Sequence, residues 1–493
     1  MGRHAKTVLT EDGLDRRETG YYSTPDFVAK FMTSALMEVN PSGTHALDPC
    51  VGRGELVDYF LRLGRDITGM DIESHPLQLS GEIDFVKADF LQYFSERVQN
   101  PLFADNFFSR FDYYIANPPY NCHEVDYIRK NRLNLESAFA AVGVHNLYAM
   151  FVYAMIVSAR EGAAIGFITL DSFLNSNCYA ALRRVIFDLC SIHYLILCPN
   201  DLFRDQKADV RTCLMILQKG RRFQNRVKVS DRPTSKAQFR QILEEELFSE
   251  VSLSQITLNF ELDDDEFIVG CPDEVKNLFN LPRLGQMFKC FTGISTGNDE
   301  AYLRKEKESG FSVPFYKNPG SRRFYTEPDG FLCDNFLDVG QRVKNFMVRN
   351  RDLIGKEGIT CSSMGVPFTA CFRPEGSAIG VNANILCDDK DDIWWLIAFL
   401  NSSLATYIVR GCLLRTNMIT SGYVSRIPVP RFSSETKQTL GSLAKNAYVN
   451  RLRPGEYGKT TAAIDSVIFN DVQLLPNTRL FVQSFASNII LRT

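Results

Sequence analysis

The sequence predicts an α/β fold of seven strands over residues 22–220, followed by a second, mixed α/β domain. Three observations carry this prediction. Short apolar runs alternate with amphipathic stretches along the first 220 residues, as expected for strands that are connected by helices. Three successive strands each end in an acid, and a Gly-x-Gly turn follows the first of them. From about residue 284 the pattern changes to short strand-like runs separated by Gly, Pro and Asn.

The bulk composition of the 493-residue chain is that of an ordinary globular protein of two or three domains. No apolar run reaches the ~18 residues of a membrane span, so we expect a soluble, cytoplasmic protein without a membrane partner. Thirteen scattered cysteines without a Cys-x-x-Cys pair argue against a disulfide framework and a structural zinc site, and we expect no metal. The net charge of −3 leaves nucleic-acid binding to a local basic face.

The first expected helix follows a polar arm over residues 1–21. A hydroxyl before Pro25 and an acid after it predict Ser23 or Thr24 as the N-cap and Pro25 as the first helical residue. Further helices are expected over 56–63, 147–159 and 171–190, the last capped by Asp171. Seven strands are expected, of which the last two lie close enough to form an antiparallel pair: 44–48, 66–71, 83–86, 111–116, 163–169, 192–198 and 210–218.

The turn after the first strand contains Gly52 and Gly54, which let backbone amides approach a ligand where a Cβ would clash. Taken alone, Gly-x-Gly is equally typical of any tight β-α turn. The acid that ends the second strand stands at the spacing where a carboxylate reaches the ribose hydroxyls of a nucleoside. Together with the glycine turn, three acids in register indicate an adenosine-type ligand: Asp48, Asp71 and Asp89.

The fourth strand stops at Asn117-Pro-Pro-Tyr120. Neither proline can donate to a ladder or continue a helix, so a rigid turn is predicted at the carboxyl end of the strand, where open α/β sheets bind ligands. A fixed side-chain amide beside an exposed aromatic ring suits a flat substrate that bears an amine. A plain strand-ending turn is the alternative for the tetrapeptide alone.

Three loops complete the expected first domain and its connection. The basic stretch 121–135, with Arg129-Lys-Asn-Arg132, is interpreted either as a solvated loop or as a loop that contacts phosphate. Phe203, alone among polar residues, either anchors its loop or contacts the substrate. Residues 221–283, first basic and then acidic, are expected to connect the two domains.

The second domain, 284–493, is expected to contain one clear apolar helix over 391–409. Basic and aromatic residues in its turns and loops fit a nucleic-acid reader, although a solvated surface is the alternative for any one of them. The arginines considered are Arg322, Arg323, Arg349, Arg351, Arg410, Arg415, Arg426 and Arg431.

Taken together, these motifs resemble the class I S-adenosylmethionine-dependent methyltransferases, and among them the gamma-class DNA adenine-N6 methyltransferases of the TaqI type. The first 220 residues carry five motifs of that family in its order: Ser23-Thr24-Pro25, Asp48-Pro-Cys-Val-Gly52-Arg-Gly54, Asp71, Asp89-Phe90 and Asn117-Pro-Pro-Tyr120. Cys50-Val51 and Arg53 stand where Ala-Cys and Ser are usual. Three later segments look like parts of such a family's target-recognition domain: 291–301, 399–402 and 427–430.

The resemblance implies a seven-stranded Rossmann-like catalytic domain with S-adenosylmethionine as cofactor. It places Thr24 and Asp48 at the methionine end of the cofactor, beside the turn of Gly52 and Gly54. It places Asp71 at the ribose diol, Asp89 at the adenine amino group and Phe90 on the adenine face.

The substrate implied by the resemblance is an adenine flipped out of double-stranded DNA. The Asn117 side-chain oxygen and the Pro118 carbonyl would accept hydrogen bonds from its N6 amino group, while Tyr120 and Phe203 would stack on its faces. The implied enzyme acts as a monomer on DNA, with a companion restriction endonuclease as a candidate partner.

Three other functions remain open on the sequence. Asn-Pro-Pro-Tyr also occurs in methyltransferases of RNA bases and of protein glutamine, which usually lack a long carboxyl-terminal reader. A catalytically inactive DNA-specificity protein on the same fold is the second alternative. The third is a fused nuclease suggested by Pro272-Asp-Glu-Val-Lys276, but these elements are adjacent rather than separated, and the short stretch before Thr24 leaves no room for a nuclease domain.

Overall fold

The computed structural model describes residues 22–74, 77–99, 107–119, 124–206, 210–220, 226–364, 367–414 and 418–487. The chain forms two compact units, Met1–Gly270 and Cys271–Thr493, and each is described by itself. The expected arm over residues 1–21 and the predicted site residue Tyr120 lie outside the described residues.

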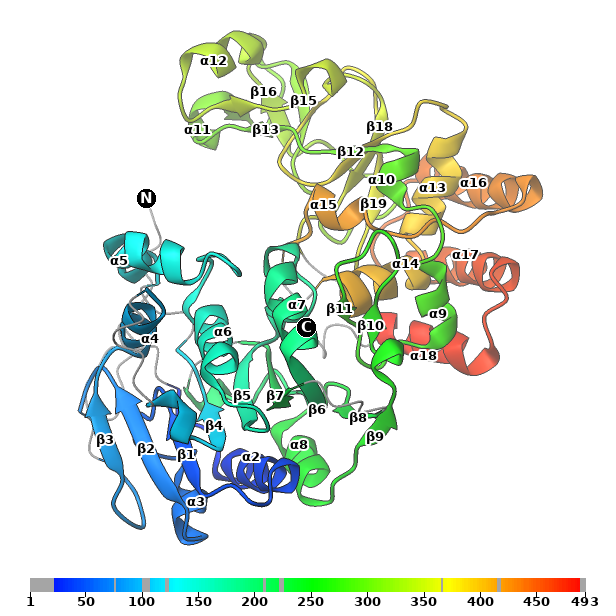
Figure 1. The fold of residues 1–493 in the computed structure, drawn as a ribbon. Coiled ribbons are helices and arrows are strands. Elements are labelled where there is room, and N and C mark those ends of the chain that lie inside the picture. The colour runs from blue at the N-terminus through cyan, green and yellow to red at the C-terminus, as the bar shows by residue number, and fades with distance from the viewer. Residues whose placement is uncertain are drawn as a thin grey trace. The chain divides into compact units, whose positions relative to one another are not determined.

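The first unit is built on a nine-stranded sheet with the strand order β3-β2-β1-β4-β5-β7-β6-β8-β9 (Figure 1). Strands β1 to β5 pair in parallel, while β7 runs antiparallel to both β5 and β6, which confirms the α/β class and the expected antiparallel pair. The strands are β1 His45–Asp48, β2 Asp66–Asp71, β3 Asp84–Lys87, β4 Tyr113–Ala116, β5 Ala164–Leu170, β6 Cys190–Leu197, β7 Thr212–Lys219, β8 Val227–Ser230 and β9 Ser249–Val251.

The expected count of seven strands is wrong, because β8 and β9 extend the sheet beyond β6. Both come from the region 221–283 that the charge pattern assigned to a connection. Val227 and Val229 are buried, and the intervening Lys228 bonds to Glu38 and to the Tyr194 hydroxyl, so a basic residue here serves a strand. The boundary between the units falls after Gly270.

Helices cover both faces of this sheet (Figure 1). On one face α2 (Asp26–Val39) packs against β5, β7 and α8 (Lys236–Glu244), with α3 (Asp58–Arg62) beside it. On the other face α6 (Leu147–Ser158) packs against β5, with α4 (Phe90–Gln99) and α7 (Ala180–Leu189) on its two sides. The sequence of α6 is apolar along nearly its whole length, as expected for a helix that the sheet and the neighbouring helices enclose.

The predicted N-cap of the first helix is wrong. The helix α2 begins at Asp26 after Pro25, and no side chain caps it. The Ser23 and Thr24 hydroxyls instead take part in contacts with residues far along the chain, which are described below.

Two further local predictions are wrong, one for the stretch 121–135 and one for the helix expected over 171–190. Residues Glu124–Ala138 form the helix α5, not a loop, and its exposed arginines pair with acids three or four positions away within the helix. Residues 171–179 form two short 3-10 turns, so α7 begins at Ala180. Asp171 is buried and pairs with Arg232 from the segment after β8.

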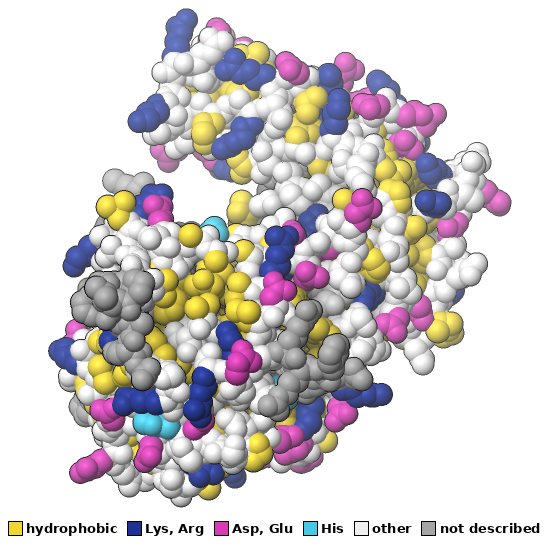
Figure 2. Space-filling view, in the orientation of Figure 1, with side chains coloured by type: hydrophobic (Ala, Val, Ile, Leu, Met, Phe, Trp, Pro, Cys, Tyr) yellow, Lys and Arg dark blue, Asp and Glu magenta, His cyan; other side chains and the backbone are white. Residues whose placement is uncertain are grey.

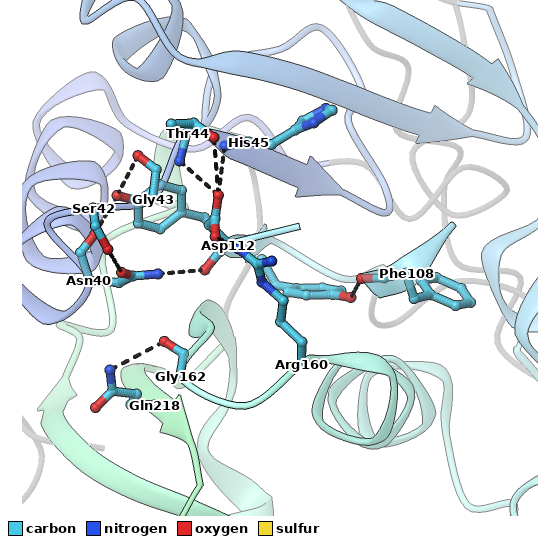
Figure 3. A network of polar contacts seen from close by, with 12 residues as sticks. Asn40, Ser42, Gly43, Thr44, His45, Phe108, Asp112, Arg160, Gly162 and Gln218 are labelled. Atoms are coloured by element: carbon cyan, nitrogen blue, oxygen red, sulfur yellow. Dashed lines mark hydrogen bonds and ion pairs between the residues drawn. The ribbon is translucent and has the colours of Figure 1, made fainter. Parts of the chain in front are cut away.

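A polar network joins the amino-terminal ends of β1 and β4 (Figure 3). Asp112, just before β4, accepts hydrogen bonds from the backbone amides of Thr44 (2.7 Å) and His45 (3.2 Å) and pairs with Arg160. Burial favours the neutral acid, but these amides and the guanidinium outweigh it and hold the pKa of Asp112 below its usual range. The network therefore fixes the two strands at this edge of the sheet.

The second unit is mixed α/β, with two four-stranded sheets, β12-β21-β18-β19 and β14-β16-β15-β20, and the pair of β13 (Ile294–Ser295) with β17 (Met347–Val348). The strands of the first sheet are Lys289–Phe291, Asn384–Leu386, Gly358–Cys361 and Ala370–Arg373; those of the second are Leu303–Arg304, Gly330–Leu332, Val313–Tyr316 and Ala378–Ile379. Helical elements of this unit include α9 Asp273–Leu278, α12 Phe336–Arg342, α13 Asp392–Leu400, α14 Ser403–Tyr407, η8 Ile408–Leu413, α16 Ser434–Val449, α17 Tyr457–Asp471 and α18 Pro476–Ser487.

The apolar helix expected over 391–409 is divided into α13, α14 and η8, with a bend of 60° after α13. Within the described ranges no single helix is long and apolar enough to cross a membrane, and this bent pair alone passes by length and composition. Most of its apolar side chains are buried within the unit, as in a core helix.

Candidate active site

Asn117 stands directly after β4, and its side-chain amide is fixed in orientation. Its Nδ2 donates to the Tyr22 carbonyl oxygen (2.8 Å) and to Thr24 Oγ1 (3.1 Å). A carbonyl can only accept, so the nitrogen must face Tyr22 and the oxygen must face away from it. Among the described residues nothing donates to this buried Oδ1. Leaving a buried acceptor unpaired costs about 1–3 kcal/mol, so the chain holds Oδ1 ready for a donor at some expense of stability.

Residues 22–25 form an extended segment that supports this amide. Ser23 Oγ donates to Glu55 Oε1 (2.8 Å), and the Ser23 backbone bonds twice to the Gln206 side chain (2.8 and 2.7 Å). The Ser23 and Thr24 hydroxyls, which the sequence assigned to a helix cap, therefore bond to the glycine turn and to Asn117, while the Ser23 backbone bonds to the loop after β6.

The glycine turn after β1 adopts the conformation that its residues predict. Gly52 and Gly54 have φ of 53° and 91°, in the left-handed region. A Cβ on Gly54 would lie 2.4 Å from Leu79 Cδ2, so a larger residue would have to displace the Leu79 side chain. The backbone amide of Gly52 donates to Asp71 Oδ2 (2.9 Å), so the acid of β2 lies at the turn.

Asp48, the last residue of β1, is 1% exposed and accepts a hydrogen bond from the Cys50 amide (3.0 Å). Burial raises its pKa to about 8, and the neighbouring charges of Asp71 and Glu55 act in the same direction. Much of this carboxyl group is therefore protonated at neutral pH. A cation bound beside it would favour the ionised form.

Asp89 and Phe90 make more contacts within the protein than their motif predicts. Asp89 Oδ1 accepts the amides of Leu91 and Gln92 at the start of α4, and Oδ2 accepts the Tyr127 hydroxyl (2.7 Å). Phe90 is 1% exposed and packs against other aromatic rings of the core. A carboxylate oxygen can accept a second hydrogen bond, so Asp89 retains capacity for a ligand, whereas the Phe90 ring is covered.

Phe203 is connected to the Asn117 site by Tyr22, which contacts both residues. The two ring centroids are 6.0 Å apart with an interplanar angle of 57°, and it is the Tyr22 carbonyl that accepts from Asn117. Phe203 itself is 1% exposed, so Tyr22 presents the more accessible ring of the pair. Pro118 is buried beside Asn117.

Sequence patterns missed three polar residues of this site: Glu55, Tyr127 and Gln206. Each acts through a contact with a residue at least 32 positions away. Neither helical nor strand periodicity marks such contacts. The position of Gln206 in the same polar loop as Phe203 was the only available signal.

The arginines of the second unit, which the sequence analysis considered together, differ in their burial. Arg323 is half-buried and donates to the Asn401 carbonyl (3.2 Å) and to Thr461 Oγ1 (2.7 Å), and Arg410 is buried. Arg415 lies outside the described residues, and Arg426 is half-buried. The exposed members are Arg322, Arg349, Arg351 and Arg431.

The recognition-like segments and the nuclease-like stretch have structural contacts. In 399–402 the Asn401 side chain bonds to both backbone groups of Ala370, and Ser402 caps α14. In 427–430 the backbone bonds to Pro282 and Leu284. The stretch 272–276 forms the start of α9.

The family model of N-6 DNA methylases matches residues 14–268, which end next to the boundary of the first unit. The modification methylase CviBIII of Paramecium bursaria Chlorella virus NC1A is 25% identical over 188 residues, 36% of this chain and 44% of that protein. The chain thus matches less than half the length of this relative.

Two solved structures share the fold over most of the chain. The type IIL restriction-modification enzyme MmeI in complex with DNA matches 96% of this chain and 79% of its own, with a TM-score of 0.61 and 10% identity. A nuclease-deletion mutant of the type ISP enzyme LlaGI with a DNA substrate mimic matches 88% and 55%, with a TM-score of 0.57 and 12% identity. From the family match, which spans more than half of its residues, this chain belongs to the N-6 DNA methylase family.

Proposed function

We propose that this chain transfers a methyl group from S-adenosylmethionine to the N6 amino group of an adenine flipped out of double-stranded DNA. The observation that carries the proposal is the Asn117 side chain, whose Oδ1 is buried, fixed in direction and unpaired among the described residues. The adenine amino nitrogen is a poor nucleophile, because its lone pair is delocalised into the ring. Two acceptors, Asn117 Oδ1 and the Pro118 carbonyl, would draw its N–H bonds out of the ring plane and free the lone pair for attack.

The residues around the glycine turn fit the proposed cofactor, which supplies a methyl group on a sulfonium. Gly52 and Gly54 hold the turn in a left-handed conformation, and Asp71 already lies at the turn. The carboxyl of Asp48, with its raised pKa, would ionise beside the cationic methionine end. We assign Thr24 to the same end, Asp71 to the ribose diol and Asp89 to the adenine amino group. Phe90 would form the wall behind the adenine.

Stacking on the flipped base would involve the residues after Pro119 and the loop after β6. We assign the Tyr120 ring to stack on one face of the base. On the other side we assign the Tyr22–Phe203 pair, in which Tyr22 covers Phe203. Each stacked face would contribute about 1–3 kcal/mol to holding the base.

We assign DNA-site recognition to the second unit. Lys and Arg side chains gather over the part that carries α12, as Figure 2 shows. In residues 342–351 four of them are exposed and form no ion pair with any residue in the described ranges: Arg342, Lys344, Arg349 and Arg351. Such side chains suit phosphate contacts. A companion restriction endonuclease, action as a monomer and a cytoplasmic location stay predictions.

The test is methyl transfer from labelled S-adenosylmethionine to double-stranded DNA by wild-type protein and by Asn117→Ala. We expect the substitution to abolish transfer while cofactor and DNA binding stay near normal, because Asn117 positions the amino group and carries no charge. Asn40→Ala is the matched control, since that amide donates to the Asp112 carbonyl at the opposite edge of the sheet and should leave transfer intact. Substantial transfer by Asn117→Ala would refute the assignment.

A truncation tests the division of labour between the two units. We expect protein ending at Gly270 to keep cofactor affinity and to lose selectivity for its DNA site. Retained selectivity would overturn the role given to the second unit. Transfer to RNA or to protein glutamine, but not to DNA, would identify one of the alternative methyltransferase activities.

A further inference from the structure

Gln206 links the loop after β6 to the segment before α2. It ends the short 3-10 turn η5 (Arg204–Gln206), next to Phe203. Its side-chain amide pairs with the backbone of Ser23 at both ends: Ser23 N–H donates to Oε1 (2.8 Å), and Nε2 donates to the Ser23 carbonyl (2.7 Å). These residues are 183 positions apart in the sequence.

The peptide group between Tyr22 and Ser23 lies in the middle of a chain of hydrogen bonds. Its N–H donates to Gln206 Oε1, and its carbonyl accepts from Asn117 Nδ2 (2.8 Å). The chain thus runs from the Gln206 amide through one peptide to the Asn117 amide. It ends at Asn117 Oδ1, the buried acceptor to which no described residue donates.

We propose that Gln206 is a positioning residue for methyl transfer, acting on the substrate amino group through the Tyr22–Ser23 peptide and the Asn117 amide. This inference rests on the proposed function. Gln206 fixes the plane of the peptide, and the peptide carbonyl fixes the direction of Asn117 Oδ1. Each hydrogen bond of such a chain also polarises the next, so Oδ1 becomes a stronger acceptor than that of an isolated amide.

The local fold does not depend on Gln206 alone. Ser23 Oγ is held separately by Glu55 (2.8 Å), and the Pro25 carbonyl accepts the amides of Val28 and Ala29 in the first turn of α2. Removing the Gln206 amide should therefore leave the segment in place and release the rotation of one peptide group. Such a change lowers the rate of the chemical step more than it lowers binding.

The first experiment compares Gln206→Met with Gln218→Met. Gln218 is a matched control because its side-chain amide also makes two hydrogen bonds to the backbone of the first unit: its Nε2 donates to the carbonyls of Val39 and Gly162 at the opposite edge of the sheet (Figure 3). At saturating cofactor and DNA, we expect Gln206→Met to lower the single-turnover rate of methyl transfer about tenfold or more, with both dissociation constants within about twofold of wild type. Gln218→Met should lower the unfolding temperature without lowering that rate.

The second experiment uses the pH profile of Gln206→Glu. A carboxylate keeps the acceptor for Ser23 N–H but sets an oxygen against the Ser23 carbonyl, whereas a protonated carboxyl group again supplies a donor. We expect its transfer rate, relative to wild type, to rise as the pH is lowered through the pKa of the new carboxyl group. The relative rate of Gln206→Met should not change with pH.

These outcomes separate the inference from the function on which it rests. If wild-type protein methylates DNA and Gln206→Met behaves like Gln218→Met, the positioning role is wrong and the function stands. A rate loss that disappears at saturating cofactor, or identical pH profiles for both Gln206 variants, also overturns it. Absence of transfer by wild-type protein refutes both.

Discussion

Two buried aspartates lie at opposite edges of the same sheet, and their environments differ. Asp112, before β4, accepts two backbone amides and pairs with Arg160, which holds its pKa below the usual range. Asp48, at the end of β1, accepts the Cys50 amide and lies near Asp71 and Glu55, so burial and these charges raise its pKa to about 8. At the amino-terminal edge Asp112 finds amide and guanidinium partners within the chain, whereas at the carboxyl-terminal edge Asp48 has a raised pKa and no described residue donates to Asn117 Oδ1.

This difference shows which edge of the sheet stabilises the unit and which edge keeps groups that are free to bind a ligand. A buried carboxylate with amide and guanidinium partners favours the folded state, but one beside other carboxylates opposes it. Groups that destabilise the ligand-free fold persist where a ligand can satisfy them. The comparison therefore predicts opposite consequences for substitutions at the two edges.

The largest effect on stability is expected for Asp112→Ala. It leaves the amides of Thr44 and His45 and the Arg160 guanidinium without their acceptor, so the free energy of unfolding should fall by about 3 kcal/mol. Because the pKa of Asp112 is lowered by folding, its stabilisation is present above the ordinary carboxyl pKa and is lost as pH falls through the folded value. Urea unfolding at several pH values should show the two proteins converging in acid.

The control for Asp112→Ala is Asp126→Ala, which removes an exposed ion pair with Arg129 on α5. We expect a change within about 0.5 kcal/mol. Methyl transfer per folded molecule should survive both substitutions. A large loss of transfer by folded Asp112→Ala would contradict the separation of the two edges.

Asp48→Asn should stabilise the fold, in contrast to Asp112→Ala. Because folding raises the pKa of Asp48, the folded chain holds more protons than the unfolded chain between about pH 4 and about pH 8, so wild-type stability should fall as pH rises through this window. The variant should lack this fall and unfold at a higher temperature than wild type at pH 8. Its cofactor affinity should drop about tenfold to a hundredfold, because the charged partner is lost.

Calorimetric titration with S-adenosylmethionine across this pH range checks the prediction for Asp48. Wild-type affinity should increase with pH as the carboxyl group ionises, and the affinity of Asp48→Asn should be flat. Equal pH dependence in the two proteins would place the titrating group elsewhere.

Apart from the Asp126→Ala control, the smallest effect is expected for Tyr127→Phe. The substitution removes one donor to Asp89 Oδ2 (2.7 Å), while Oδ1 continues to cap α4, so unfolding should cost about 1 kcal/mol less. Cofactor affinity should change little, because Asp89 keeps its acceptor. A large loss of affinity in a binding titration would instead make Tyr127 part of the cofactor site.

Local patterns predicted the elements of the first unit well, because strands and their ending acids leave periodic or adjacent signals. β2 occupies the residues expected, and Asp71 ends it beside the glycine turn. Failures arose where partners lie far along the chain. Ser23 and Thr24 have the residue types of a helix cap, but Glu55 and Asn117 bind their hydroxyls. No local rule contains those contacts.

The basic segment before β8 shows the same limit. Its charges predicted a connection, yet Lys228 lies within β8 and bonds to Glu38, 190 positions earlier, and this strand joins the sheet beside β6. In the second unit the sequence shows how many arginines there are, but it does not show which of them are buried and which are exposed. Burial separates Arg323, which holds backbone and hydroxyl oxygens, from Arg349 and Arg351, which face solvent.

The extended segment at residues 22–25 has a consequence for the order in which the protein acquires its parts during synthesis. Its partners are separated from Ser23 by 32 positions at Glu55 and by 183 at Gln206, and Asn117 lies 95 positions after Tyr22. The earliest translated part of this site must therefore wait for a much later part, because contacts of such long loops form slowly. The ribosome makes Tyr22 long before Gln206, so a nascent chain can form the sheet's first strands while the Asn117 amide still lacks its fixed direction.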